Sequence, residues 1–380
     1  MQETHTMPTN PVRVTKLKQS LWLDNIQRRQ LKNGELAAMI ERGDIRGMTS
    51  NPSIFHAAIT KSDDYTDALT ALAKAGRSAE EIYEHLAVED IQAAADLFRP
   101  LYDETSGEDG YVSLEVSPYL AYDTEKTIAE ARRLWAWVNR PNLMIKIPAT
   151  QPGLPAITET LANGINVNVT LIFSQTRYME VMDAHLSGLE KRLQAGQPIK
   201  GIASVASFFI SRIDSKIDKK LEDIMRQEGQ TAAVAASLRG RLAIANAKLA
   251  YEKFKEVCQS ERALKLKQHG ARMQRPLWAS TSTKNPAYPD TLYVDELIGP
   301  NTVNTVPPNT LEAFIDHGTV RQTLESNLPH ASQAFEELRT VGILFQQITQ
   351  ELEDEGVKAF EDAFTALLQA IEAKRQAVLT

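Results

Sequence analysis

The stretch LMIKIPA, residues 143–149, is an apolar run that carries one ammonium group, on Lys146. Proline lies close to both ends of the run, which is typical of a short β-strand. Side chains alternate along a strand, so Lys146 shares a face with Met144 while leucine and isoleucine occupy the other. Burial disfavours the charged form of a lysine and leaves a neutral amine that can attack a carbonyl group. We therefore expect Lys146 to be a nucleophile; the alternative is a lysine on an edge strand, or one that reaches water.

Seven further apolar or β-rich runs predict strands on either side of this one. In chain order the eight runs are residues 20–26, 47–53, 111–118, 143–149, 166–173, 201–209, 277–283 and 301–307. Helical patterns separate them, for example at residues 127–138 and 213–224. No glycine-rich dinucleotide turn follows the first strand, so this alternation predicts a closed parallel (β/α)8 TIM barrel rather than a doubly wound sheet.

The order of the elements predicts one α/β domain over residues 1–380. Its barrel strands extend from about residue 20 to 307, and a helical carboxyl-terminal part covers about residues 310–380. The long segment between the sixth and seventh strands predicts extra helices on the barrel exterior. Apolar positions within 338–348 and 360–371 predict amphipathic or buried helices that close the side of the barrel.

The composition is that of an ordinary globular protein, with 43% hydrophobic and 24% charged residues in 380. One cysteine, Cys258, excludes an intramolecular disulfide and a multi-cysteine metal site, and it fits a reducing compartment, so we expect a cytoplasmic protein. Residues 1–19 contain no apolar core of a signal peptide, and no apolar run has membrane-spanning length. The net charge of −7 argues against general affinity for nucleic acid.

Polar side chains recur on one face of several predicted strands, although barrel strands are usually apolar on both faces. The other face is apolar, as on the fifth strand with Val167, Val169, Leu171 and Phe173. If that apolar face packs on the outer helices, the polar face points into the barrel mouth. Active sites of such barrels lie there, at the carboxyl ends of the strands. By alternation the inward set contains Asp24, Thr49, Asn51, Ser113, Glu115, Ser117, Asn166, Asn168, Thr170, Ser207 and Phe209.

Local structural roles are also open to these side chains. Asp24 is able to cap the next helix, and Asn51 before Pro52 is able to form an Asx turn. Thr170 or Ser207 is able to bond a neighbouring carbonyl group. Taken singly, each such role is about as good an interpretation as a functional one.

Together these residues form a ring around an inward lysine. Glu115 and Asp24 supply proton donors and acceptors. Asn51, Asn168 and Ser207 supply neutral hydrogen bonds suited to hydroxyl groups. The set predicts Schiff-base chemistry on a polyhydroxylated carbonyl compound.

Two cations follow the sixth and seventh strands. Arg212 lies at the start of the predicted helix 213–224, and a helix amino end with a guanidinium group predicts a phosphate site. The alternative is a solvated arginine paired with Asp214 or Asp218. Lys284, after Ser280-Thr281-Ser282-Thr283, is a weaker candidate of the same kind.

Metal and nucleotide sites are not predicted. The seven histidines are scattered without a His-x-His or His-Glu-x-x-His pattern, so the ligands of a metal-dependent aldolase are missing. The sequence also has no Gly-x-x-x-x-Gly-Lys-[Ser/Thr] phosphate loop.

Five segments resemble the transaldolase family, Schiff-base enzymes of the non-oxidative pentose phosphate pathway in the class I aldolase superfamily. They are LWLDN at 21–25, MTSNPSIF at 48–55, VSLEVSP at 112–118, MIKIPAT at 144–150 and NVNVTLIF at 166–173. The family has the barrel fold expected above, with its reactive lysine on the fourth strand, where Lys146 falls. Extra sequence before the seventh strand and at the carboxyl end resembles the longer subclass, without a fused isomerase domain.

The resemblance implies a role for each matching residue. Lys146 would form the imine with the ketose donor, and Asp24 would take the proton from the C4 hydroxyl as the C3–C4 bond breaks. Glu115, through a water held by Thr170, would move protons between carbinolamine and imine.

The remaining matches imply substrate binding. The hydroxyls of the dihydroxyacetone unit would be held by Asn51, Asn168 and Ser207, and Arg212 would bind the phosphate. Shorter family members carry Ser-Phe-Arg where this chain has residues 280–284, which leaves the second phosphate ligand open.

The expected reaction moves a dihydroxyacetone unit from sedoheptulose 7-phosphate or fructose 6-phosphate to glyceraldehyde 3-phosphate or erythrose 4-phosphate. No cofactor is expected, because a protonated imine is itself an electron sink. One alternative is a fructose-6-phosphate aldolase, but that relative has glutamine at the position of Glu115 and tyrosine at that of Phe209. Another is a catalytically silent barrel that binds sugar phosphates. The expected partners are small sugar phosphates, with no nucleic acid or membrane, and the oligomeric state stays open.

Overall fold

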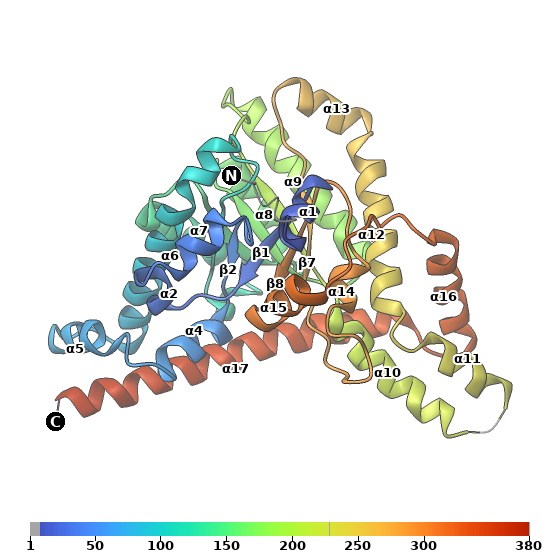
Figure 1. Ribbon diagram of the computed structural model, residues 1–380. Helices are drawn as coiled ribbons and strands as arrows, with labels where there is room; N and C mark the ends of the chain where they lie inside the picture. The colour runs from blue at the N-terminus through green and yellow to red at the C-terminus, as the bar shows by residue number, and fades with distance from the viewer. Residues whose placement is uncertain (1–7, 228, 380) are drawn as a thin grey trace, which may run out of the picture.

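Eight parallel strands close into one barrel in the computed structural model, which describes residues 8–227 and 229–379 (Figure 1). Each strand pairs with its neighbours in the chain, and β8 pairs with β1. The strands are β1 (Gln19–Asp24), β2 (Met48–Thr49), β3 (Val112–Glu115), β4 (Leu143–Pro148), β5 (Val167–Ile172), β6 (Ser204–Phe209), β7 (Arg275–Ala279) and β8 (Thr302–Val306). The predicted barrel is therefore confirmed, with ends that differ from the predicted runs by a few residues.

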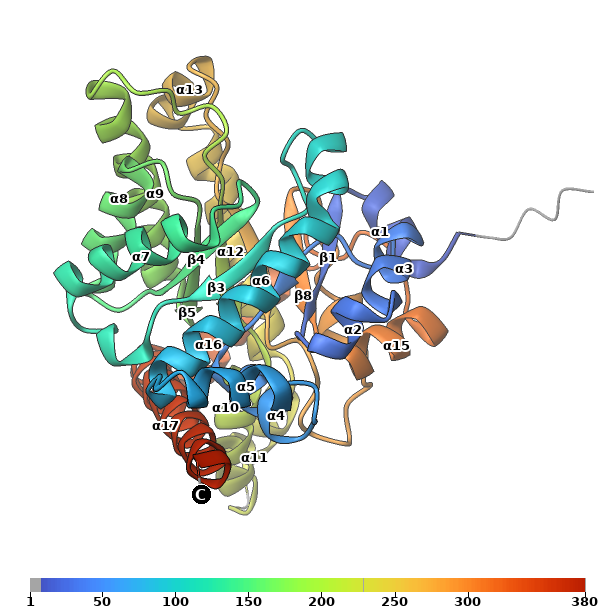
Figure 2. The same cartoon turned by 90° about the vertical axis from the view of Figure 1, so that its left-hand side faces the viewer.

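Helices surround the barrel, as Figures 1 and 2 show. In the first half of the chain they are α1 (Asn10–Lys16), α2 (Arg28–Lys32), α3 (Glu35–Glu41), α4 (Pro52–Thr60), α5 (Thr66–Lys74), α6 (Ala79–Glu104), the 3-10 turn η1 (Pro118–Leu120), α7 (Thr124–Val138), α8 (Gly153–Ala162) and α9 (Gln175–Gln194). Four helices between β6 and β7 confirm the predicted insertion: α10 (Ser211–Met225), α11 (Gln230–Leu238), α12 (Leu242–Cys258) and α13 (Glu261–Gln268). The last are α14 (Leu292–Asp295), α15 (Pro308–His317), α16 (Leu328–Thr340) and α17 (Phe345–Leu379).

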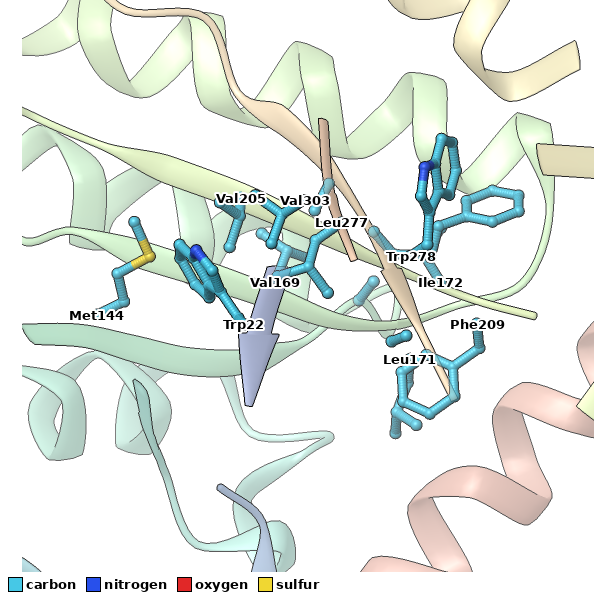
Figure 3. Packing of buried hydrophobic residues seen from close by; sticks show 14 of the residues in the cluster. Trp22, Met144, Val169, Leu171, Ile172, Val205, Phe209, Leu277, Trp278 and Val303 are labelled. Atoms are coloured by element: carbon cyan, nitrogen blue, oxygen red, sulfur yellow. The ribbon is translucent and has the colours of Figure 1, made fainter. Parts of the chain in front are cut away.

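Apolar side chains fill the amino-terminal half of the barrel interior. Figure 3 shows Trp22 and Met144 next to each other there, with Val205 beside them. A Cβ atom on Gly47 would lie 2.6 Å from the Trp22 ring, so only glycine at 47 leaves room for this indole. Most of the predicted site residues lie in the carboxyl half, beyond this apolar layer.

A buried carboxylate ties the strands together at the amino end. Asp109, just before β3, accepts hydrogen bonds from Ser20 at 2.8 Å and from the Trp22 indole at 3.3 Å. It also pairs with Arg46 at 2.6 Å and with Arg275 of β7 at 3.3 Å. One side chain therefore connects β1, the turn before β2, and β7.

Strict alternation on β5 ends after Thr170. Leu171 has φ 60°, and the pairing of β5 with β6 shifts between Val169 and Ile172. This bulge reverses the direction of the side chains that follow it. The centroids of the Phe173 and Phe209 rings therefore lie 5.2 Å apart at the barrel mouth. The prediction that residues 171 and 173 pack on the outer helices is wrong for this reason.

The long carboxyl-terminal helix α17 crosses the mouth of the barrel. It packs against α4, α5, α6, η1, α10 and the end of β5, which lie at the carboxyl ends of the strands or lead away from them (Figures 1 and 2). A Cβ atom on Gly356 would lie 3.0 Å from Leu171, so the helix approaches β5 closely. The sequence predicted helices that close the side of the barrel, and for α17 that placement is wrong. The apolar series at 338–348 is also broken, because Gly342 with φ 81° lies between α16 and α17.

Among residues 8–227 and 229–379, none of the helices combines the length and the apolar character of a membrane span. Residues 1–7, part of the segment expected to lack a signal peptide, lie outside the described chain. That residues 1–380 fold as one domain stays a prediction.

Candidate active site

Strand register brings the predicted residues side by side. Glu115 of β3 is the register partner of Lys146 of β4, and Lys146 is the partner of Asn168 of β5. Across the barrel, Asp24 of β1 is the partner of Thr49. Register partners on neighbouring strands face the same way, so these side chains converge on the barrel axis.

A pocket of about 170 Å³ opens at this end of the barrel. Eight of the ten predicted site residues line it: Asp24, Asn51, Lys146, Thr170, Ser207, Phe209, Arg212 and Lys284. Glu115 and Asn168 are not among its lining residues. A larger cavity, about 730 Å³, lies at the other end around Trp22 and Met144, but the groups equipped for chemistry gather in the smaller pocket.

Lys146 is enclosed rather than exposed at a sheet edge. It is 4% exposed on a strand paired on both sides, so the edge-strand and solvent-exposed alternatives are wrong. Its Nζ donates to the carbonyl oxygen of Ser50 at 3.2 Å and lies 3.5 Å from Glu115 Oε2. The Phe360 ring of α17 covers it, with 5.7 Å between Nζ and the ring centroid.

Glu115 is buried next to Lys146, but its carboxylate oxygens accept no hydrogen bond from the rest of the described chain. Among the described residues, neither carboxylate oxygen of Glu115 nor the hydroxyl of Thr170 has a hydrogen-bond partner. Burial raises the pKa of Glu115 to about 7, although Lys146 acts in the opposite direction. The carboxyl group can therefore gain and lose a proton near neutral pH, as a general acid and base must.

Asp24 is the second carboxylate of the pocket. It accepts a hydrogen bond from Thr49 Oγ1 at 2.7 Å, and it does not cap α2, whose N-cap is Gln27. Burial raises the pKa of Asp24, while Lys146 and the bond from Thr49 partly offset this effect. The two carboxyl groups thus approach the lysine from different strands.

Of the predicted amide and hydroxyl side chains, Asn51 and Ser207 line the pocket, whereas Asn168 lies behind its wall. Asn51 caps α4, because its Oδ1 accepts from Ile54 N at 3.0 Å; the local interpretation is correct, and the residue lines the pocket as well. Ser207 donates to Asn168 Oδ1 at 2.7 Å, and Asn168 donates to Ser113 at 3.0 Å. Asn168 is fully buried, so it orients Ser207 from behind the pocket wall.

Arg212 and Lys284 lie together on the outer rim. Burial lowers the pKa of Arg212, and its guanidinium carbon lies 5.3 Å from the centre of the Phe209 ring. Neither cation has a carboxylate within ion-pair distance in residues 8–227 and 229–379. The alternative pairing of Arg212 with Asp214 or Asp218 is wrong, because those carboxylates bond other groups.

Several lining residues were not predicted. Thr305 of β8, 3% exposed, bonds Thr49 at 2.7 Å, and alternation on the last strand would have placed it inward. Ser280 and Ser282 follow β7 in a loop whose path the sequence does not reveal. Phe360 comes from α17, and no local pattern places a helix across the mouth.

No group of three or more His, Cys, Asp or Glu side chains is arranged to hold a metal ion in the part of the chain that the structure describes. The pocket offers an amine, the carboxyl group of Asp24, hydroxyls and a cationic rim, and a second carboxyl group, that of Glu115, lies 3.5 Å from the amine. Such a set can form an imine with a carbonyl compound and bind an anion at its far end.

Comparison with known proteins agrees with this chemistry. The model of the family described as Transaldolase/Fructose-6-phosphate aldolase matches residues 21–371. A protein of Thermobifida fusca (strain YX) named Transaldolase is 51% identical over 353 residues, which cover 93% of this chain and 94% of that protein. Transaldolase of Trichodesmium erythraeum (strain IMS101) is 47% identical over 365 residues, 95% of this chain and 96% of that one. Transaldolase 1 of Streptomyces avermitilis is 50% identical over 353 residues, with coverage of 93% and 92%.

Proposed function

The chain belongs to the transaldolase/fructose-6-phosphate aldolase family and acts as a transaldolase, and we propose that it transfers a dihydroxyacetone unit through an imine on Lys146. The observation that carries this proposal is the placement of Lys146. A lysine that is 4% exposed opens onto a pocket between two carboxyl groups whose pKa values are raised.

The first half of the reaction cleaves the donor. Lys146 Nζ attacks C2 of a ketose phosphate. Glu115, through a water held by Thr170, protonates the departing hydroxyl of the carbinolamine, so that water leaves and the imine forms. Asp24 then takes the proton of the C4 hydroxyl as the C3–C4 bond breaks. The aldose phosphate departs, and the electron pair of that bond rests in an enamine, for which the protonated imine is the sink.

The second half reverses these steps with a new aldehyde. The enamine carbon adds to the carbonyl carbon of the acceptor, and Asp24 returns the proton to the new hydroxyl. Water then attacks the imine carbon with help from Glu115, and the product leaves Lys146. In this proposal no metal or organic cofactor takes part.

Substrate recognition divides along the pocket. Asn51 and Ser207 hold hydroxyls of the dihydroxyacetone unit, and Arg212 binds the phosphate. Lys284 lies on the same rim as Arg212 and supplies a second positive charge there. The donors are sedoheptulose 7-phosphate or fructose 6-phosphate, and the acceptors are glyceraldehyde 3-phosphate or erythrose 4-phosphate.

Trapping the imine tests the role of Lys146. Borohydride added with fructose 6-phosphate should inactivate the protein and attach the reduced three-carbon unit to Lys146, as read by peptide mass spectrometry. Lys248 is a matched control inside the chain, because it is also 4% exposed but pairs with Glu296 on the outside of the barrel. Labelling of another lysine, or none in an active preparation, would overturn the assignment.

A donor-alone assay distinguishes the two activities in the family's name. Free dihydroxyacetone should form far more slowly than transfer product once erythrose 4-phosphate is supplied. Equal rates would identify an aldolase instead. A protein that binds fructose 6-phosphate without forming either product would be the silent barrel.

A further inference from the structure

The two cations of the pocket rim repel each other. Burial lowers the pKa of Lys284, and the charge of Arg212 lowers it further, whereas Asp24 acts in the opposite direction. Lys284 Nζ donates to Ser282 Oγ at 2.7 Å, a contact that carries no negative charge. The start of the loop that carries Lys284 is tied to the start of α10, because Ser211 bonds Ser280 through its N–H at 3.1 Å and through its hydroxyl at 2.9 Å. The far side of the loop needs a second contact if Lys284 is to stay next to Arg212.

Tyrosine hydroxyls join this region to the helix that carries Arg212. Tyr288 OH donates to Asp218 Oδ2 at 2.6 Å, and Tyr293 OH donates to Asp214 Oδ2 at 2.8 Å. Asp214 and Asp218 are both buried and lie one turn apart on α10. Asp214 and Asp218, the alternative partners of Arg212 in the sequence, thus accept hydrogen bonds from tyrosines instead.

Tyr288 fits closely in its place. Gly240 donates its N–H to the other oxygen of Asp218 at 3.1 Å, and its φ is 68°. A Cβ atom on Gly240 would lie 2.8 Å from the Tyr288 ring. The ring and the hydroxyl are therefore both fixed, and Lys284 lies four residues before Tyr288 in the same loop.

We infer that Tyr288 is a positioning residue for phosphate recognition: its bond to Asp218 holds Lys284 opposite Arg212, so that both cations meet one phosphate group. Because Arg212 and Asp218 belong to the same helix, the bond fixes the loop relative to the arginine. Without it, only the Ser280–Ser211 contacts tie the loop to α10 among the described residues, and repulsion between the cations moves Lys284 outward. The inference rests on the proposed phosphate site at Arg212, and it does not depend on the proposed imine at Lys146.

Tyr288→Phe tests this with Tyr293→Phe as matched control. Each variant loses one hydroxyl bonded to a buried aspartate of α10, but Tyr288 belongs to the loop that carries Lys284, whereas Tyr293 belongs to α14. Tyr288→Phe should raise KM for fructose 6-phosphate and Kd for inorganic phosphate by about three- to tenfold, the loss of one hydrogen bond. Its kcat should stay within about twofold, and turnover of unphosphorylated fructose should not change. Tyr293→Phe should lower only the unfolding temperature.

A double variant tests whether Tyr288 acts through Lys284. Lys284→Ala should weaken phosphate binding, and Lys284→Ala with Tyr288→Phe should be no weaker than Lys284→Ala alone. Additive losses, or equal losses for fructose and fructose 6-phosphate, would overturn the inference. If Tyr288→Phe does not fold, Asp218→Asn should show the same selective loss, and its absence there is equally decisive.

Calorimetry with inorganic phosphate separates this inference from the proposed function. Phosphate binding is measured without turnover, whereas borohydride trapping reports the imine. Unlabelled Lys146 with intact phosphate binding counts against the imine alone. Labelled Lys146 with phosphate binding that is indifferent to Tyr288→Phe counts against Tyr288 alone.

Discussion

At the scale of single residues, burial alone does not distinguish a reactive lysine. Lys146 and Lys248 are equally buried, and burial lowers the pKa of Lys248. Lys248 bonds a carbonyl oxygen at 3.1 Å and pairs with Glu296 at 3.5 Å on an outer helix. Lys146 has the same two kinds of contact, but it opens onto a pocket next to a carboxyl group without hydrogen bonds. Lys146 therefore differs from Lys248 in that a substrate in the pocket can reach its amine.

Glu115 should govern the pH dependence of turnover. Its carboxyl group is largely protonated below pH 7 and ionised above it, since burial raises its pKa to about 7. The kcat profile should therefore show an inflection near pH 7. In Glu115→Gln that inflection should disappear and kcat should fall by about 100-fold, the lower end of the range for a lost general acid and base. An unchanged inflection in Glu115→Gln would assign it to another group, which stopped-flow assays from pH 5 to about pH 9 can detect.

At the scale of elements, alternation predicted the inward face well where the strands are regular. The positions of Asp24, Lys146 and Thr170 in the pocket follow from strand parity alone. Parity failed from residue 171 onward, because a positive φ and a register shift are set by neighbouring strands rather than by local sequence. The sequence also did not show that Asn51 has a capping and a pocket-lining position at once.

Substitutions at the start of α10 and on the strands should affect different kinetic constants. Arg212→Ala should raise KM for fructose 6-phosphate by a factor equivalent to about 2–4 kcal/mol, because the proposed phosphate contact would be lost in ground and transition states alike. Asp24→Ala should lower kcat instead, because its proton transfer belongs to the bond-breaking step. Initial rates with fructose as donor are the control. An equal loss for both donors in Arg212→Ala would show that the arginine has only a structural role.

Helix α17 should control access of water to the amine. Phe360 covers Lys146, while Phe364, one turn later, packs its ring on Tyr83 and Tyr119 instead. Phe360→Ala and Phe364→Ala should each lower the free energy of unfolding by about 3 kcal/mol, as measured in urea. Phe360→Ala alone should increase the release of free dihydroxyacetone relative to transfer. If both variants release it equally, general loosening of the helix is the cause.

At the scale of the whole molecule, stability and chemistry reside at opposite ends of the barrel. The amino end holds Trp22, Met144 and the network around Asp109, and the carboxyl end holds the pocket. The sequence identified the barrel from its eight runs, because each strand has its own apolar signal. It could not place α17, whose position depends on contacts with segments far away in the chain.

Asp109→Asn should therefore lower stability without changing kcat. Burial raises the pKa of Asp109, but Arg275 and Arg46 outweigh it and hold the pKa below its usual value of 3.8. A lowered pKa stabilises the fold above about pH 3.8, and this contribution is lost as the pH falls further. At pH 7 the variant should lose about 3 kcal/mol of unfolding free energy. Urea titrations at several pH values should show the difference from wild type shrinking in acid; a constant difference would point to lost packing.

The position of α17 also has a consequence for biosynthesis. A ribosome makes all eight strands and Lys146 before it makes Phe360, so the barrel can close several seconds before its mouth is covered. During that interval we expect the amine to be accessible to carbonyl compounds, because Phe360, which covers it in the finished protein, is not yet present. Ribosomes arrested after residue 341 would display this state, and borohydride trapping of simple aldehydes on Lys146 would measure it. Synthesis and docking of α17 would therefore also end the exposure of Lys146 to carbonyl compounds.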